Sequence, residues 1–163
     1  MIKITKQDPI VVANFVIAIA KKDQIDLTNL YLNKILFYVQ GYYLTKYQQK
    51  LFNAEFTNWT DDPIISSIYD LFRNNGSSSI INTYRGINIT NYQLIIINYN
   101  LQNLSTIQII ELNRLIRQLL TIRPWQMSKS IKKTKIENKD QYSKQDLIRN
   151  YQQLARDFKI EKR

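Results

Sequence analysis

Few residues of this chain could carry out chemistry, because its 163 residues include no histidine and no cysteine. Their absence excludes disulfides, metal sites built from thiolates or imidazoles, and Ser-His or Cys-His nucleophilic dyads. A carboxylate pair such as Asp61-Asp62 would have to act instead, and adjacent residues seldom converge on one reacting atom. Ser130 to Lys133 fits the S-x-x-K motif of penicillin-recognising enzymes, but the companion motifs are absent, so we interpret the match as chance. We therefore expect no enzyme, no cofactor and no metal site.

Two tryptophans, each close to a proline, are the residues best suited to binding another protein. Tryptophan is enriched at binding hot spots, so Trp59, in the stretch WTDDP, can anchor an interface with two aspartates at its rim. The alternative is structural: Trp59 packs on the preceding helix, and Asp62 only caps a helix whose first residue is Pro63. Trp125 has the same two interpretations, an exposed contact or a core residue at the start of a helix. The candidate partner-binding residues are Trp59, Asp61, Asp62, Pro63, Pro124 and Trp125.

The charge of the chain indicates a second kind of partner. Its formal net charge is +10, and residues 128–163 contribute +6 of this from 11 basic and 5 acidic residues. Such a basic tail attracts phosphates or an acidic protein surface. No aromatic residue lies between Ser128 and Gln141, and no helix-turn-helix or RNP motif is evident, so a solvated basic loop is the default interpretation. The candidate nucleic-acid contacts are Lys129, Lys132, Lys133, Lys135 and Lys139.

The elements that must position these residues are predicted to be mostly helical. Residues 77–100, rich in Ile, Thr and Tyr with Gly86 near the centre, predict two or three short strands around a turn, although 92–101 also fits a helix. Residues 130–140 are polar and predict a loop. The fold class is therefore α-rich α+β, a single globular domain of five or six helices with a small antiparallel β element. Helical spacing and capping residues predict helices over 9–22, 28–46, 62–75, 105–121 and 143–159, and a short one from Pro124.

The N-terminus has the makings of a signal peptide, with a basic start, an apolar run over 10–20, and Ala18 to Ala20 resembling a cleavage site. An amphipathic first helix is the favoured interpretation, because Asp8 can cap it and Pro9 can occupy its first position. No run of 18 apolar residues occurs, so we expect no transmembrane helix and no membrane partner. The expected location is the cytoplasm.

The run from Leu32 to Tyr47 is apolar on two faces, which is typical of a central, buried helix. Gly41 in its middle is unexpected, since glycine costs about 1 kcal/mol relative to alanine inside a helix. A glycine without a Cβ lets a second backbone come close. We therefore predict that Gly41 is a packing site.

Residues 28–72 resemble the SocA-like antitoxin domain, also called Panacea and known from the phage-associated protein GepA. The family typically shows TNLKLQKLLYYAQGWYL, where this chain has TNLYLNKILFYVQGYYL. The shared residues before the link are Thr28, Asn29, Leu30, Leu32, Lys34, Leu36, Tyr38, Gln40, Gly41, Tyr43 and Leu44. Those after it are Leu51, Phe52, Phe56, Trp59, Pro63, Ile64, Tyr69 and Phe72. Pro124-Trp125 matches a later PW, and the last helix is similar too, so the resemblance covers 13–154.

The chain departs from this family at two places. Thr60, Asp61 and Asp62 replace the usual Lys-Tyr-Gly, and LLTIRPW lacks the histidine that usually precedes PW. The segment 77–100 has no counterpart in the family pattern.

The resemblance implies binding rather than catalysis. Proteins of this family look like antitoxins that neutralise a neighbouring toxin, or adaptors that deliver it to a protease complex. It also implies that Gln40 and Gly41 belong to a shared core, in which Gln40 hydrogen bonds a neighbouring backbone. We expect residues 1–127 to form the SocA-like helical core with a β insertion around 78–100, and 128–163 to add a basic loop and a final helix to the same domain. The alternative function is a basic nucleic-acid-binding regulator of a mobile element.

Overall fold

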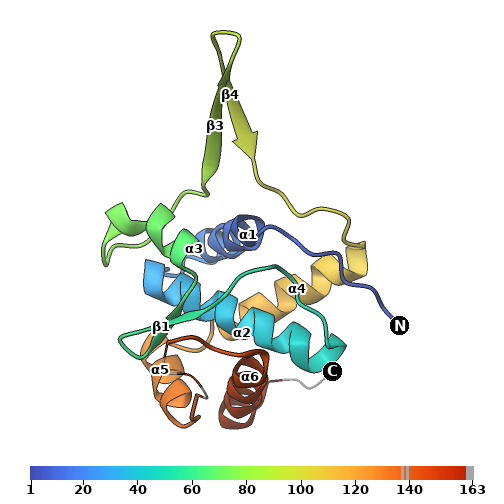
Figure 1. The fold of residues 1–163 in the computed structure, drawn as a ribbon, viewed down its shortest axis with the longest axis vertical. Helices are drawn as coiled ribbons and strands as arrows, with labels where there is room; N and C mark the ends of the chain where they lie inside the picture. Colours follow the sequence, from blue (N-terminus) through green and yellow to red (C-terminus); the bar gives the residue numbers. More distant parts are fainter. Residues whose placement is uncertain (137, 139, 161–163) are drawn as a thin grey trace.

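The computed structural model describes residues 1–136, 138 and 140–160. These residues form six α-helices, one 3-10 helix and two separate two-stranded antiparallel sheets (Figure 1). The fold is the α-rich α+β domain that the sequence predicts. The helices are α1 (Pro9–Lys22), α2 (Asn29–Tyr47), α3 (Ser66–Leu71), η1 (Arg73–Asn75), α4 (Thr106–Leu119), α5 (Pro124–Lys132) and α6 (Lys144–Phe158). The strands are β1 (Thr57–Trp59) with β2 (Asp62–Ile64), and β3 (Arg85–Thr90) with β4 (Gln93–Asn98).

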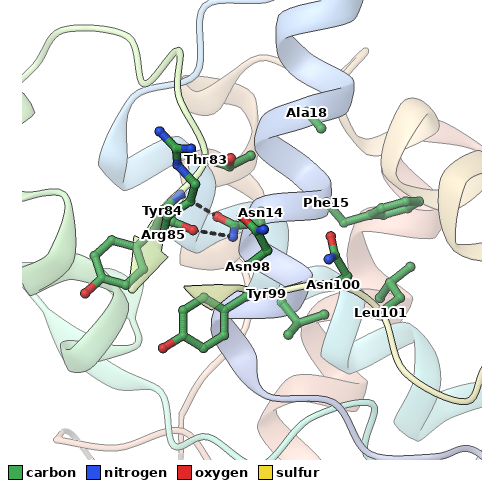
Figure 2. A pocket seen from close by; sticks show the side chains of 11 residues that line it. Asn14, Phe15, Ala18, Thr83, Tyr84, Arg85, Asn98, Tyr99, Asn100 and Leu101 are labelled. Atoms are coloured by element: carbon green, nitrogen blue, oxygen red, sulfur yellow. Dashed lines mark hydrogen bonds between the residues drawn. The ribbon is translucent and has the colours of Figure 1, made fainter. Parts of the chain in front are cut away.

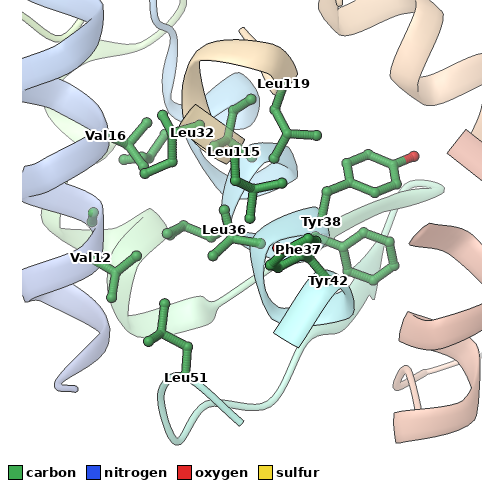
Figure 3. Packing of buried hydrophobic residues seen from close by; sticks show 14 of the residues in the cluster. Val12, Val16, Leu32, Leu36, Phe37, Tyr38, Tyr42, Leu51, Leu115 and Leu119 are labelled. Carbon is green, nitrogen blue, oxygen red and sulfur yellow. The ribbon is translucent and has the colours of Figure 1, made fainter. Parts of the chain in front are cut away.

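Helix α2 is the centre of the helical body. Every residue from Tyr31 to Leu44 is buried, so the predicted central helix is confirmed. Helices α1, α4 and α6 pack around it because each presents an apolar stripe to one of its faces. Figure 3 shows part of this core, with Val12 and Val16 from α1, Leu32 and Leu36 from α2, and Leu115 and Leu119 from α4.

The helix starts follow the predicted capping residues. The Asp8 carboxylate accepts a hydrogen bond from the Ile10 amide at 3.0 Å, and the Thr28 hydroxyl accepts one from the Tyr31 amide at 3.2 Å. Helix α4 begins at the predicted Ser105 cap, and α6 begins with the predicted reciprocal pair of Ser143 and Asp146. These caps satisfy amides that have no partner inside the helix.

The prediction that Asp62 caps a helix starting at Pro63 is wrong. Residues Asp62–Ile64 form strand β2, and α3 begins only at Ser66. The sequence signal is misleading because Asp62 lies in strand β2, where its carboxylate forms an ion pair with Lys34 of α2 instead of capping a helix. Pro63 pairs with Asn58 across a short sheet instead of starting a helix.

The insertion between α3 and α4 is an extended hairpin, which we call the β3–β4 ribbon. It projects from the helical body at the top of Figure 1. Residues 93–98 are a strand, which decides the open choice between strand and helix for 92–101. The turn lies at Asn91 and Tyr92, whose φ angles are 52° and 63°. Two left-handed residues match the twist that a two-residue hairpin requires.

The segment 130–140 is only partly a loop. Helix α5 continues through Ser130 to Lys132, because Ile131 is buried in the core and holds this turn against the domain. Lys139 lies outside the described residues. None of the helices in the described residues is both long and apolar enough to cross a membrane.

Candidate functional site

The β1–β2 hairpin presents Trp59 at the surface. Thr60 and Asp61 form its two-residue turn with φ angles of 47° and 67°. Thr60 is β-branched, so this left-handed conformation costs on the order of 1 kcal/mol and must be held by its surroundings. Trp59 is 44% exposed, and its ring centroid lies 5.3 Å from that of Tyr69 in α3. One side of the indole therefore packs on α3, and the other side is exposed.

A buried ion pair holds the hairpin in place. The Lys34 ammonium lies 3.1 Å from the Asp62 carboxylate, and the Lys34 side chain is only 5% exposed. The same carboxylate oxygen accepts a hydrogen bond from the Ser128 hydroxyl at 3.2 Å. Asp62 thus joins the hairpin to α2 and to α5. Sequence reasoning missed this role of Lys34, although a lysine inside a run of apolar residues is a signal that a carboxylate must lie nearby.

A third extended segment flanks the hairpin. The Asn58 amide donates to the Asp140 carbonyl, and the Tyr142 amide donates to the Phe56 carbonyl, both at 2.9 Å. The Tyr142 ring then packs edge-on against Phe37 of α2, with centroids 4.9 Å apart. The chain after α5 therefore supports β1 from the side opposite β2.

Helix α5 presents the second tryptophan. Pro124 is its first residue, as predicted, but the alternative of a core Trp125 is wrong, because this side chain is 63% exposed. Trp125 lies one turn before Ser128, which contacts Asp62. The start of α5 and the β1–β2 hairpin are therefore neighbours, at the lower left of Figure 1.

The six predicted partner-binding residues come from two elements on one side of the domain, which we call the tryptophan surface. Trp59, Asp61 and Trp125 are exposed, and Pro124 is half-buried. Pro63 is buried and Asp62 is half-buried, so these two support the surface from beneath. The surface is defined as Trp59, Asp61, Asp62, Pro63, Pro124 and Trp125.

The two structural residues of α2 have the predicted contacts. The Gln40 amide nitrogen donates to the Phe52 carbonyl at 2.7 Å, and its oxygen accepts from the Leu51 amide at 3.0 Å. Gly41 faces α6, where a Cβ would lie 2.7 Å from the Leu147 carbonyl oxygen. Gln40 therefore fixes the chain after α2, and Gly41 allows α6 to approach.

The predicted basic residues do not all lie together. Lys129 and Lys132 are exposed on α5, whereas Lys133 and Lys135 line a groove of about 560 Å³ between the end of α5 and α6. Arg149 and Arg156 of α6 complete this basic groove, which the sequence analysis missed. Their spacing of seven residues, two turns of one helix face, was the signal that could have found them.

The S-x-x-K match is explained by packing within the domain. The Ser130 hydroxyl is buried and donates to Asp157 at 2.9 Å, and Lys133 pairs with the same carboxylate at 3.2 Å. Burial by itself would raise the pKa of Asp157, but these bonds outweigh it and lower the pKa. The residues of the match therefore tie α5 to α6.

A second polar cluster joins the end of α2 to α4. Lys46 and Tyr47 hydrogen bond the Glu111 carboxylate at 2.5 and 2.6 Å. Burial by itself would raise the pKa of Glu111, but these bonds outweigh it and lower the pKa. A carboxylate held ionised in this way is a structural contact rather than a proton donor. Within the described part of the chain, no group of three or more acidic residues is placed to hold a metal ion.

A family model supplies the comparison that decides the identity of the domain. The model described as "Antitoxin SocA-like, Panacea domain" matches residues 32–153, which is more than half of the chain. The chain belongs to the SocA-like (Panacea) antitoxin family. No curated protein and no solved structure matches the chain significantly.

The matched region contains the features described above. It begins within α2 and ends within α6, so it includes Lys34, Gln40, Gly41 and the whole tryptophan surface. The SocA-like region also includes the β3–β4 ribbon. Helix α1 precedes it and packs on it through Val12 and Val16 (Figure 3).

Proposed function

We propose that this SocA-like protein is a non-enzymatic antitoxin that binds a toxin encoded by a neighbouring gene. It neutralises the toxin by covering it or by delivering it to a protease complex. Family membership supports an antitoxin role, and one observation supports the place of binding: two exposed tryptophans lie on adjacent elements. Buried Lys34 anchors the element that carries the first of them.

A tryptophan that is already held in place binds a partner at a low cost in conformational entropy, because an exposed indole in a fixed position loses little freedom when the partner covers it. The hairpin is fixed by the contacts of Asp62 with Lys34 and Ser128, so Trp59 is positioned before the partner arrives. Tryptophan is also among the residues that contribute most to binding at protein interfaces.

The proposal predicts the effect of removing either indole. Co-expression with the neighbouring toxin should restore growth and yield a stoichiometric complex. Trp59→Ala and Trp125→Ala should each raise the Kd of that complex about tenfold or more, because truncating an anchor of this kind costs at least about 1.4 kcal/mol. Isothermal titration calorimetry on the purified proteins measures the change.

Ile107→Ala is the matched control, since Ile107 is 79% exposed on α4 and lies outside the tryptophan surface. Its Kd should stay within about twofold of the wild type. Equal affinities for the wild type and both tryptophan variants would remove the tryptophan surface from the interface. A neighbouring gene product that neither inhibits growth nor binds would refute the antitoxin function itself.

Nucleic-acid binding is the second candidate function, and the basic groove favours it. Four cations from the end of α5, the following loop and α6 line this groove: Lys133, Lys135, Arg149 and Arg156. Two of these cations already pair with carboxylates of α6, which weakens the groove as a phosphate site. We place this function behind toxin binding for that reason.

Salt dependence tests the second candidate. If phosphates bind in the basic groove, log Kobs for a 20-mer duplex should fall steeply with log salt, with a slope of roughly −0.9 per neutralised phosphate. Lys135→Glu with Arg156→Glu should abolish the mobility shift. The matched control is Lys129→Glu, an exposed lysine outside the groove. No shift of DNA or RNA at low salt would exclude this function.

Three further features belong to the same proposal. The protein acts in the cytoplasm, and its gene belongs to a phage or mobile element of the GepA kind. Residues 1–127 carry the helical core with its β insertion around 78–100, and α5 and α6 pack on the same domain and belong to the SocA-like region, which the family match extends to residue 153. The packing of α6 against α2 at Gly41 supports this arrangement.

A further inference from the structure

The β3–β4 ribbon exposes aliphatic side chains on both of its faces. Residues directly opposite each other in an antiparallel pair share a face. Ile87 pairs with Ile96 and Ile89 pairs with Leu94, so these four form an apolar stretch of one face, and the pair Arg85 and Asn98 continues that face at the base of the ribbon. The exposed fractions of the four apolar residues are 68%, 50%, 72% and 65%. The other face carries Ile95 and Ile97, which are 46% and 37% exposed.

An exposed apolar ribbon of this kind requires an explanation. Isolated two-stranded hairpins are marginal in water, and soluble proteins usually protect exposed edges with charges or proline. Residues 86–110 contain no charged residue and no proline, in a chain of net charge +10. Each strand is paired along one edge only within the described residues. The ribbon therefore offers apolar faces and free backbone edges together.

The base of the ribbon is fixed to the helical body. The Asn14 side chain of α1 donates to the Tyr84 carbonyl and accepts from the Tyr84 amide, both at 2.8 Å (Figure 2). The rings of Tyr84 and Tyr99 stack with centroids 6.0 Å apart, on the two chains that enter and leave the ribbon. Because its base is already fixed, the ribbon loses little conformational entropy when a partner binds it.

Three cations surround a second groove beside this base. Lys21 and Lys22 of α1 and Arg85 of β3 line it, and its volume is about 750 Å³. Within the described part of the chain, none of their side chains forms a hydrogen bond or an ion pair with another residue. A surface that combines these exposed cations with the apolar side chains farther along the ribbon complements carboxylates placed beside an apolar cleft.

The size of the ribbon argues against a second copy of this chain. Six residues per strand give each face a length of about 20 Å and a width of about 10 Å. That area is far below the roughly 800 Å² per partner of a stable interface. A second copy of the ribbon would cover only one face of the first and would leave its other face exposed. A partner that encloses both faces and reaches the base provides the missing area.

A lipid surface fits less well than a protein. Hydrocarbon would leave the free amides and carbonyls of both strand edges without hydrogen-bond partners, which costs several kcal/mol for each group. A protein with a free strand edge can satisfy them by adding its strand to β3 or β4. We propose that the β3–β4 ribbon inserts into a cleft of the toxin, where it adds to a sheet edge and places Lys21, Lys22 and Arg85 on acidic residues at the rim. This inference rests on the proposed antitoxin function and names a second contact with the same partner.

The test uses the full chain and the neighbouring gene product that co-purifies with it. Ile87→Thr with Ile96→Thr keeps β-branched side chains, and therefore strand propensity, but removes the apolar character of one face. This double variant should raise the Kd about 100-fold, as expected when two anchors are lost. Ile107→Thr with Ile110→Thr, on exposed positions of α4, is the matched control and should stay within about threefold. Circular dichroism and an unchanged Tm establish that both variants fold.

Each outcome decides the inference. Loss of affinity in the ribbon variant alone supports it. Equal affinity of wild type and ribbon variant overturns it and leaves the antitoxin function intact. Absence of any binding neighbour overturns both. Dimers of the wild type in light scattering that the ribbon variant loses would assign the ribbon to a second copy, and ribbon-dependent sedimentation with phosphatidylserine vesicles would assign it to membranes; either result overturns the inference.

Discussion

Replacing Gly41 by alanine is expected to lower the free energy of unfolding by about 3 kcal/mol, the upper range for overpacking a core. A Cβ at this position would lie 2.7 Å from the Leu147 carbonyl oxygen and 2.9 Å from the Tyr151 Cβ. Both atoms belong to or sit directly on the backbone of α6, so neither can move aside by changing a rotamer. The gain in helix propensity, about 1 kcal/mol for alanine over glycine, is smaller than this clash. Urea denaturation measures the change.

Gly86→Ala is the matched control for this prediction. Its Cβ would lie 2.9 Å from the Tyr99 hydroxyl, which is the far end of a side chain and can rotate away, and 3.3 Å from the Ile97 Cβ, where a shift of a few tenths of an ångström in the projecting ribbon gives enough room. The free energy of unfolding should therefore change by less than about 1 kcal/mol. Equal stability of the Gly41→Ala variant and the wild type would mean that α6 does not pack on α2 as described.

Replacing Asp62 by alanine is expected to lower the free energy of unfolding by about 3 kcal/mol, the usual cost of leaving a buried charge without its partner. Lys34 has a 5% exposed side chain, and its ammonium would lose the carboxylate that lies 3.1 Å away. The hairpin would also lose its bond to Ser128, so Trp59 would no longer be held in place. Thermal unfolding measures the first effect, and toxin affinity measures the second.

The double variant Lys34→Met with Asp62→Ala separates these two effects. It removes the buried charge together with its partner, so stability should return to within about 1 kcal/mol of the wild type. Toxin affinity should remain low, because the link from the hairpin to α2 and α5 is still missing. A double variant that is as unstable as Asp62→Ala would show that the ion pair contributes more than compensation of the Lys34 charge.

The local rules predicted most helix starts because caps act over three residues. Asp8, Thr28, Ser105 and Ser143 each bond amides within their own first turn, so these four helix starts require no contact with a distant part of the chain. Asp62 followed by Pro63 has the sequence pattern of a fifth helix cap. Its failure has a distant cause, since Lys34 lies 28 positions earlier in the chain and captures the carboxylate.

The candidate site was only partly predictable for a similar reason. The sequence named both tryptophans as possible anchors, but their exposure depends on which atoms of other elements cover them. The Trp59 ring packs against Tyr69 of α3 and is 44% exposed, while Trp125 on α5 is 63% exposed. The basic groove combines lysines at and just after the end of α5 with two arginines of α6. These arginines lie at least 14 positions later in the chain, so only the folded structure brings the four side chains together. The proposed antitoxin function rests on the resemblance and the family match, since no chemistry in these residues specifies a toxin.

The sequence by itself determined the helical class, the buried central helix, the packing role of Gly41 and the absence of histidine and cysteine chemistry. Each follows from composition or from spacing within one element, where geometry is fixed by the backbone. The tertiary structure alone decided that Asp62 pairs with Lys34, that both tryptophans face outward and that the β3–β4 ribbon stands away from the body with its isoleucines uncovered. These features depend on whether segments that are distant in the chain contact each other. A pattern of apolar residues predicts that they are buried, but it does not say whether another part of this chain or a partner covers them.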